Sequence, residues 1–191
     1  FGNSDNDPRD VHSHGTHVAG IAVSNDTTYR GVAPDASVVA LKVFNNAGAG
    51  NTAWAISAID WCVNNATKNN ITAITMSFGI TDSGGNEIIH TTACDSADGS
   101  GLAAAASAAA AHGLFVGASS GNAGSSTGVS SPACGENVTS VGKVSDSDAI
   151  SSSSNGGSIL DVLAPGSSIY SSVLNNGFAN KGGTSMSAPH V

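Results

Sequence analysis

Apolar segments of strand length alternate with segments of helical character along this chain, and this alternation limits the folds that it can adopt. Residues 37–44 form a continuous apolar run, which is typical of a strand buried on both faces of a parallel sheet. Residues 52–66 follow with apolar side chains at helical spacing. Strand, helix and strand then recur at 73–77, 100–111 and 114–118. We therefore predict an α/β fold: a doubly wound, mostly parallel sheet with helices on both faces.

Three more strand-like segments follow at 138–144, 159–164 and 168–173, with turn-rich segments between them. The 191 residues are enough for one large core, and we find no internal repeat or linker that would divide them. The chain starts with Phe1 and shows no signal segment, so we interpret it as an internal piece of a longer protein. We expect residues 1–191 to be the central part of a single domain, truncated at both ends.

The composition argues against two classes of partner. Charged residues make up 10% of the chain, and 14 acidic against 6 basic residues give a net charge of −8. An acidic surface disfavours binding to nucleic acid and to anionic membranes. The longest apolar run, around residues 102–111, is too short and too rich in alanine to span a bilayer. We expect neither a nucleic-acid partner nor a membrane.

The last ten residues hold a serine in a distinctive setting. Ser185 follows Gly182, Gly183 and Thr184 and opens a run that is compatible with a helix. Such a pattern lifts a hydroxyl onto a sharp turn at a helix start, where unpaired backbone N–H groups face any negative charge that develops. A glycine-rich loop capped by Ser185 explains this segment equally well when it is taken alone.

Two other segments offer groups that could work with such a serine. His14 and His17, in the segment 13–22, would share one face of a helix, a spacing that also suits a metal, but we find no set of further ligands. A histidine at a helix start is favoured in its neutral form and can act as a base. Asn122 follows a predicted strand at the edge where ligands gather in parallel sheets, although an Asn beside glycine is more commonly a turn residue.

The segments 13–20, 120–124 and 183–191 together resemble, in order and spacing, those of the subtilases, the subtilisin and proteinase K-like serine peptidases. Residues 31–34, 76–79 and 163–166 also match stretches of that family, so the resemblance covers essentially the whole chain. It implies that Ser185 is the nucleophile that attacks a peptide carbonyl and that His14 is its general base. It also implies that Asn122 and the Ser185 N–H hold the oxyanion.

The resemblance further implies where protein or peptide substrates bind. Two extended segments would clamp a peptide as an added strand: Ser77, Phe78 and Gly79 on one side, and Ala47, Gly48, Ala49 and Gly50 on the other. The walls of the first specificity pocket would be Ala118, Ser119, Gly121 and Ser130. None of these wall residues is charged, so we predict cleavage after neutral, mainly bulky apolar or aromatic residues.

A structural calcium ion is implied in the same way. Asp161 resembles a carboxylate that binds a cation together with backbone carbonyls near Glu136 and Val138, and such mixed oxygen ligands suit Ca²⁺. Cys94 and Cys134 lie in turn-like contexts and are candidates for a disulfide, which would fit an oxidising, secreted setting. We also expect a monomer, with a pro-segment in the full-length chain.

One catalytic group of the family is not identifiable. The family's Asp precedes the His and follows an apolar strand, but Asp5, Asp7 and Asp10 follow no such strand. As written, the chain is therefore expected to be nearly inactive. Two alternatives remain: a catalytically inactive homologue that binds peptides in the same cleft, and an esterase with the same hydrolase chemistry. The combination of His14, Asn122 and Ser185 favours the endopeptidase, since a binding protein has no chemical need for all three.

Overall fold

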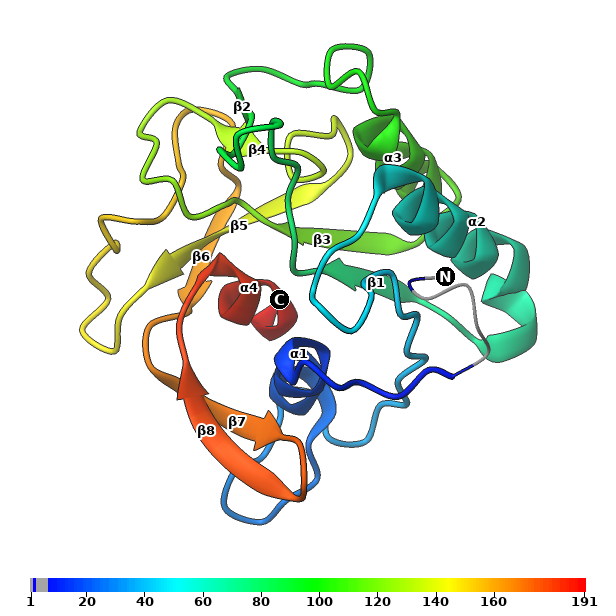
Figure 1. The fold of residues 1–191 in the computed structure, drawn as a ribbon, viewed down its shortest axis with the longest axis vertical. Helices are drawn as coiled ribbons and strands as arrows, with labels where there is room; N and C mark the ends of the chain where they lie inside the picture. The colour runs from blue at the N-terminus through cyan, green and yellow to red at the C-terminus, as the bar shows by residue number, and fades with distance from the viewer. Residues whose placement is uncertain (1, 3–6) are drawn as a thin grey trace.

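A parallel sheet lies at the centre of the computed structural model, which describes residue 2 and residues 7–191 (Figure 1). Its four strands lie in the order β1-β3-β5-β6, and every neighbouring pair is parallel. The strands are β1 (Ala73–Met76), β3 (Phe115–Ser119), β5 (Thr139–Val144) and β6 (Val162–Pro165). The predicted α/β class with a parallel sheet is confirmed.

Two helices cover one face of this sheet, α2 (Thr52–Asn69) and α3 (Leu102–Ala111) (Figure 1). The buried side of α3 is built largely from alanine, and these small side chains let the helix pack closely against β3. Helix α2 starts where the Asn51 side chain accepts a hydrogen bond from the Trp54 N–H. Among the described residues, no helix combines the length and the apolar character that crossing a membrane requires.

The other face carries α1 (His14–Val23), α4 (Thr184–Ser187) and the short 3₁₀ helix η1 (Ala188–His190). Helix α1 packs against a separate antiparallel hairpin of β7 (Ile169–Val173) and β8 (Gly177–Lys181). His17 is fully buried, and its Nε2 lies 3.1 Å from the Ile169 carbonyl and 3.0 Å from the Ala179 carbonyl. His17 therefore fastens α1 to the hairpin and is a structural residue.

A second antiparallel pair lies at the opposite end of the molecule, formed by β2 (Ile89–His90) and β4 (Val129–Ser130). Next to it, Cys94 and Cys134, the pair singled out by their turn-like contexts, form a buried disulfide with a Cα–Cα distance of 5.5 Å. The bond closes a loop between residues 40 positions apart in the sequence. Disulfides that close loops of this size typically stabilise a domain by about 2–4 kcal/mol.

The segment 37–44 corrects our expectation of a strand buried on both faces. Within the described residues it forms one isolated bridge, between Phe44 and Gly50, and Val38 and Val39 are 55% and 45% exposed. Strand β1 lies at the edge of the sheet, and no described strand pairs with its open side. An apolar run signals a tendency to be buried, but a strand also needs a continuous ladder of hydrogen bonds to a neighbour. Among the described residues this segment has only the Phe44–Gly50 bridge and a bond of 2.8 Å from the Gly2 N–H to the Lys42 carbonyl.

Candidate active site

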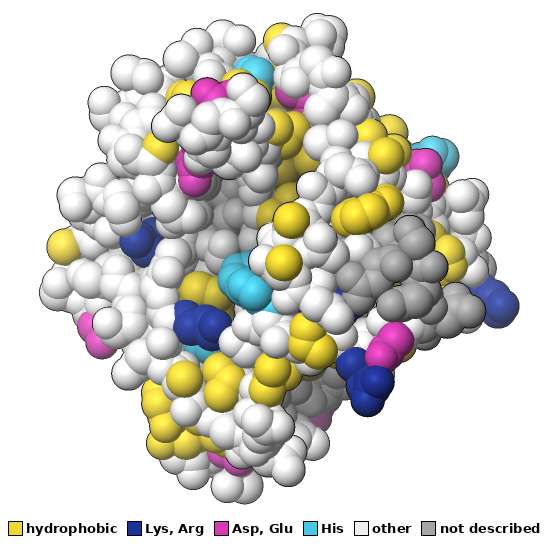
Figure 2. All heavy atoms as spheres, viewed as in Figure 1, with side chains coloured by type: hydrophobic (Ala, Val, Ile, Leu, Met, Phe, Trp, Pro, Cys, Tyr) yellow, Lys and Arg dark blue, Asp and Glu magenta, His cyan; other side chains and the backbone are white. Residues whose placement is uncertain are grey.

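The three residues predicted to carry the chemistry lie at the ends of elements that pack together. Helix α1 begins at His14, α4 begins one residue before Ser185, and Asn122 follows the carboxyl end of β3. Helix α4 contacts both α1 and β3. Figure 2 shows a hollow at the centre of this face, with histidine and basic side chains along its lower edge. The site therefore lies at the carboxyl edge of the parallel sheet, where such folds bind their ligands.

The side-chain amide of Asn122 has one defined orientation. Its Oδ1 accepts a hydrogen bond of 2.9 Å from the Thr184 N–H, and a backbone N–H can only donate. The carbonyl oxygen of the amide is thereby fixed, and Nδ2 is the end left to donate into the site. A second bond, 3.2 Å from the Gly121 N–H to Thr184 Oγ1, holds the same two segments together.

The first turn of α4 leaves a second donor. The Thr184 N–H is bonded to Asn122, and the Met186 N–H donates to the Gly183 carbonyl at 2.9 Å. The described contacts give the Ser185 N–H between them no acceptor, as expected for the first turn of a helix. Asn122 Nδ2 and the Ser185 N–H are thus two hydrogen-bond donors with unused capacity in adjoining segments.

Ser185 is half-buried and is tied to the end of β1 by a reciprocal pair of hydrogen bonds. Its Oγ donates to the Ser77 carbonyl at 3.1 Å, and Ser77 Oγ donates to the Ser185 carbonyl at 2.7 Å. Among the described contacts, no hydrogen bond joins Ser185 Oγ to His14. In this structure the hydroxyl is therefore held by the backbone of Ser77, the residue directly after β1.

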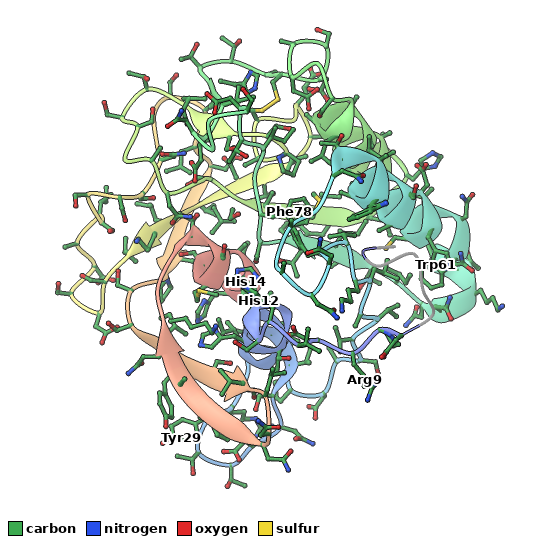
Figure 3. The ribbon with its side chains drawn as sticks, viewed as in Figure 1. Arg9, His12, His14, Tyr29, Trp61 and Phe78 are labelled. Atoms are coloured by element: carbon green, nitrogen blue, oxygen red, sulfur yellow. A yellow bond between two sulfur atoms is a disulfide. The ribbon has the colours of Figure 1, made fainter. Side chains whose placement is uncertain are left out.

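His14 lies in surroundings that favour its neutral form. Burial lowers the pKa of its imidazole, and the Lys181 cation and the His12 ring lower it further, while Asp10 acts in the opposite direction. Lys181 is placed beside the start of α1 by a 2.8 Å hydrogen bond from its Nζ to Ser13 Oγ. Figure 3 shows His12 and His14 close together at this end of α1. A neutral imidazole is the form that can accept a proton from a hydroxyl.

The acidic residues near the N-terminus are engaged elsewhere. Asp10 accepts hydrogen bonds from the Thr16 N–H and hydroxyl at 2.9 and 2.7 Å, and from the N–H groups of His12 and Ser13. Burial raises the pKa of Asp10, but these bonds outweigh it and the net pKa is lowered. Asp7 pairs with Arg9 at 2.7 Å, and Asp5 lies outside the described residues. No carboxylate of the described residues is hydrogen bonded to His14.

The two segments expected to clamp a peptide come together through an aromatic contact. Phe78 packs edge to face on Phe44, with ring centroids 5.4 Å apart, and Phe44 precedes the turn at 45–50. Within that turn the Asn45 N–H donates to the Ala49 carbonyl at 2.8 Å, and Gly48 has a positive φ of 78°. A Cβ at Gly48 would lie 2.9 Å from His12 Nε2, so this turn borders the start of α1.

The residues expected to form the specificity pocket also gather beside the site. Ala118, Ser119 and Ser130 are buried, with 0%, 3% and 0% of their surfaces exposed. Ser119 Oγ donates to the Phe78 carbonyl at 3.4 Å. Ser130 Oγ lies against Gly79, where a Cβ would come within 2.7 Å of it. These contacts join the 77–79 segment to the end of β3 and to β4.

Glu87 was not anticipated from the sequence. Its carboxylate accepts the Asn122 N–H at 2.8 and 2.9 Å, and it also accepts Asn155 Nδ2 at 2.7 Å. Glu87 lies in a turn-rich stretch that also holds Asp82, and no spacing or motif links it to Asn122, 35 positions later. Only the structure shows that the Glu87 carboxylate is hydrogen bonded to the backbone of the loop that holds Asn122.

The residues expected around a calcium ion include two exposed acidic residues, Glu136 and Asp161. Asp161 is the one expected to bind the ion through its carboxylate. Its Oδ2 accepts hydrogen bonds from the N–H and Oγ of Ser140, at 2.8 and 2.7 Å. The Val138 N–H donates to the Gly135 carbonyl at 3.1 Å, and the Glu136 N–H donates to Asp95 at 2.9 Å. The described residues show no hydrogen bond between Glu136 and Asp161.

Comparisons with known proteins agree with this α/β fold. The family model described as "Subtilase family" matches residues 1–191. "Subtilisin-like protease 1" of Trichophyton equinum is 36% identical over 98% of this chain and 34% of its own length, and "Subtilisin amylosacchariticus" of Bacillus subtilis subsp. amylosacchariticus is 39% identical over 96% and 44%. A solved structure, "Crystal structure of a cold adapted subtilisin-like serine proteinase", matches with a TM-score of 0.81 and 33% identity, covering 97% of this chain and 60% of that one.

These matches place the chain in the class of the subtilisin-like serine proteases. The chain belongs to the subtilase family. It spans between 34% and 44% of the length of the two relatives named above.

Replacing Lys181 by Met should raise the pKa of His14. The Lys181 cation disfavours a second positive charge on the nearby imidazole, so its removal makes protonation easier and moves the titration of His14 to higher pH. The change can be followed by NMR titration of the His14 ring, with Lys68→Met, in the last turn of α2, as the control. An unchanged or lower His14 pKa in Lys181→Met would contradict this account of the site's electrostatics.

Proposed function

We propose that this chain carries the nucleophile, the general base and the oxyanion donors of a serine endopeptidase that hydrolyses peptide bonds in proteins or peptides. The hydrogen bond from the Thr184 N–H to Asn122 Oδ1 is the observation that carries the proposal, because it leaves Asn122 Nδ2 and the Ser185 N–H as free donors beside one hydroxyl. Family membership supports the same chemistry.

In the proposed reaction, Ser185 Oγ attacks the substrate carbonyl while His14 takes the hydroxyl proton. The oxyanion that forms accepts hydrogen bonds from Asn122 Nδ2 and the Ser185 N–H. The C–N bond then breaks as His14 gives its proton to the leaving amine. A water molecule attacks the acyl-enzyme, His14 takes one of its protons, and Ser185 is released with that proton restored. For this, Ser185 Oγ must exchange its bond to the Ser77 carbonyl for one to His14.

A peptide-binding protein without catalysis is the second candidate. Two observations favour it: the Ser185 hydroxyl is bonded to Ser77, and no described carboxylate orients His14. In serine proteases, replacing the aspartate that orients the histidine lowers kcat about 10⁴-fold. The low charge and the clamp formed by 47–50 and 77–79 would serve a binding protein equally well. Reactivity of Ser185 distinguishes the two candidates, because only the endopeptidase needs an activated hydroxyl.

Ser185 should react covalently with a fluorophosphonate probe. Its Oγ forms a bond to phosphorus, fluoride leaves, and the hydroxyl proton passes to His14. We expect labelling of the full-length protein, none of its Ser185→Ala variant, and labelling slowed about 10²–10³-fold in its Asn122→Ala variant, the loss found on removing such a donor in subtilisin. Ser187→Ala, a buried hydroxyl of the same short helix, is the matched control and should label normally. Absent labelling, or equal labelling of Ser185→Ala in mass spectra of digested protein, would favour the peptide-binding candidate.

We propose that cleavage follows neutral, mainly bulky apolar or aromatic residues. The pocket walls expected from the family, Ala118, Ser119, Gly121 and Ser130, carry no charge. Glu87 lies behind Gly121, but its two oxygens are engaged by Asn122 and Asn155. Its remaining negative charge would repel an acidic side chain in the pocket.

A set of peptides that differ in the residue before the cleaved bond should therefore rank with Phe and Leu highest and Glu lowest in kcat/KM. The measurement is the initial rate of fluorogenic peptides of otherwise identical sequence, compared at one ionic strength because charge effects are screened by salt. A profile dominated by Lys or Arg would overturn the neutral pocket and would indicate that the Glu87 charge controls it.

We propose that a structural Ca²⁺ ion binds at Asp161 with backbone carbonyls near Glu136 and Val138. The Asp161 carboxylate is exposed, and only its Oδ2 is engaged by Ser140 among the described contacts, so Oδ1 is available to a cation. Oxygen donors of this mixed type suit Ca²⁺, which would stabilise the fold and take no part in the proton transfers.

Removal of calcium by a chelator should lower the Tm of the unmodified protein, and Asp161→Asn should abolish most of this difference. A ligand at 100 times its Kd stabilises the folded state by about 2.7 kcal/mol. Asp60→Asn, an exposed carboxylate on α2, is the control and should keep the full calcium dependence. If Asp161→Asn responds to chelator like the unmodified protein in differential scanning calorimetry, the assignment of this site is wrong.

We also propose that the protein works outside the cell, as a monomer whose full-length chain includes a pro-segment. The Cys94–Cys134 disulfide supports an oxidising compartment, because such bonds persist in secreted proteins and are rare in the cytosol.

A further inference from the structure

Glu87 is presented to the site by a hairpin that is fixed along its length. The Asp82 N–H donates to the Asn86 carbonyl at 2.9 Å, and the Ile88 N–H donates to the Ile80 carbonyl at 3.1 Å. Two residues after Glu87, strand β2 begins and pairs with β4, with Ile89 opposite Ser130. A side chain on a hairpin held in this way has little freedom to move, so its contacts can fix the position of a neighbouring loop.

The carboxylate of Glu87 lies between the backbone of Asn122 and a buried amide. Both of its oxygens accept the Asn122 N–H, and Oε2 also accepts Asn155 Nδ2 at 2.7 Å. Asn155 is 0% exposed, and its other bonds reach the Ser120 carbonyl at 3.1 Å and the Ser125 N–H at 3.0 Å. Glu87 therefore extends a buried hydrogen-bond network to the N–H of the residue that carries the oxyanion amide.

Gly121 shows how closely this hydrogen-bond network approaches the loop that holds Gly121 and Asn122. Its φ is +104°, a backbone conformation that favours glycine, and a Cβ there would overlap Asn155 Nδ2 and Glu87 Oε2. The same residue donates its N–H to Thr184 Oγ1 at 3.2 Å. The loop is thus held between α4 on one side and the Glu87–Asn155 pair on the other, with no space for a side chain.

Asn122 is consequently restrained at two points. Thr184 fixes its side-chain Oδ1, and Glu87 fixes its backbone N–H by a hydrogen bond to an ionised acceptor, which is about twice as strong as a neutral one. We propose that Glu87 is a positioning residue for the oxyanion donor: by holding the Asn122 backbone it directs Nδ2 at the place where the oxyanion forms. The proposal rests on the endopeptidase function proposed above and names a further residue on which its rate depends.

The negative charge of Glu87 has an electrostatic effect on the rate that opposes its effect as a positioning residue. A carboxylate near an oxyanion repels the charge that develops there, so removal of the charge alone would speed the reaction. Here the charge is offset by hydrogen bonds from the Asn122 N–H and Asn155 Nδ2. Misalignment of an oxyanion donor by about 1 Å can lower a reaction rate about 10²-fold. We expect this loss of rate to exceed the increase in rate that follows from removing the residual repulsion. The proposal therefore predicts that removing the Glu87 charge slows the reaction, whereas repulsion alone predicts that it speeds the reaction.

The test is a double-mutant cycle between Glu87→Gln and Asn122→Ala, read out as the maximal rate and the half-saturating concentration for fluorophosphonate labelling of Ser185. Glu87→Gln should lower the maximal rate about 10- to 100-fold and leave the half-saturating concentration unchanged. In the Asn122→Ala background the same substitution should have no effect, because the donor it positions is gone. Asp60→Asn, which also removes one exposed negative charge, is the control.

Suppose that Asn122→Ala shows its full effect, so that the oxyanion assignment stands. The role proposed for Glu87 would then be overturned by an unchanged labelling rate in Glu87→Gln or by a faster one. An equal loss of rate in both backgrounds would also overturn it, because it indicates general destabilisation. An unchanged rate in Asn122→Ala itself would overturn the oxyanion assignment, and the inference with it. If Glu87→Gln does not fold, the cycle is repeated with Glu87→Asp, which keeps the charge but is one methylene shorter. The same non-additive loss would then support the proposal, and an additive loss would overturn it.

Discussion

The candidate site depends on the hydrogen bond from the Thr184 N–H to Asn122 Oδ1. It joins two segments 62 positions apart in the sequence and decides which end of the amide faces the hydroxyl. Without it the Asn122 side chain, which is exposed, would rotate freely and the site would have one donor fewer. The reciprocal bonds between Ser77 and Ser185 fix α4 to β1 in the same way. Helix α4 is thus attached to the carboxyl ends of two strands, and the position of Ser185 follows from the sheet.

Two charged groups at the site, Lys181 and Glu87, have opposite signs and separate contacts. Burial lowers the pKa of the His14 imidazole and Lys181, beside the start of α1, lowers it further, whereas Glu87 accepts the Asn122 N–H and holds that backbone. In a chain with only 10% charged residues, the rest of this region is built from serine, glycine, alanine and asparagine. Small residues let the segments approach closely, as at Gly121, and leave few charges beside the site.

The sequence was informative where the signal is local. The parallel sheet could be predicted from the alternation of apolar and helical segments, and the candidate chemistry could be predicted from the residues around His14 and Ser185. Both signals are local, because hydrophobic periodicity, glycine spacing and capping residues each depend on a few neighbouring positions. It failed where the structure depends on distant neighbours. Residues 37–44 carry a strand-like apolar run, yet a strand needs a pairing partner that no local pattern supplies. Glu87 reaches Asn122 only through the register of β2 with β4, which the sequence does not display.

The Cys94–Cys134 disulfide has a consequence for a molecule that is exposed to proteases. The covalent loop that it closes contains α3, β3, Asn122 and β4, and its most exposed stretch is the turn after Asn122, at 122–127. A chain nicked in that turn would still be one covalent molecule, because the sulfur bridge connects the two sides of the cut. The core pairing of β3 with β1 and β5 would hold the pieces in register. Damage at the loop that is most accessible would thus remain a local break and would not release a fragment.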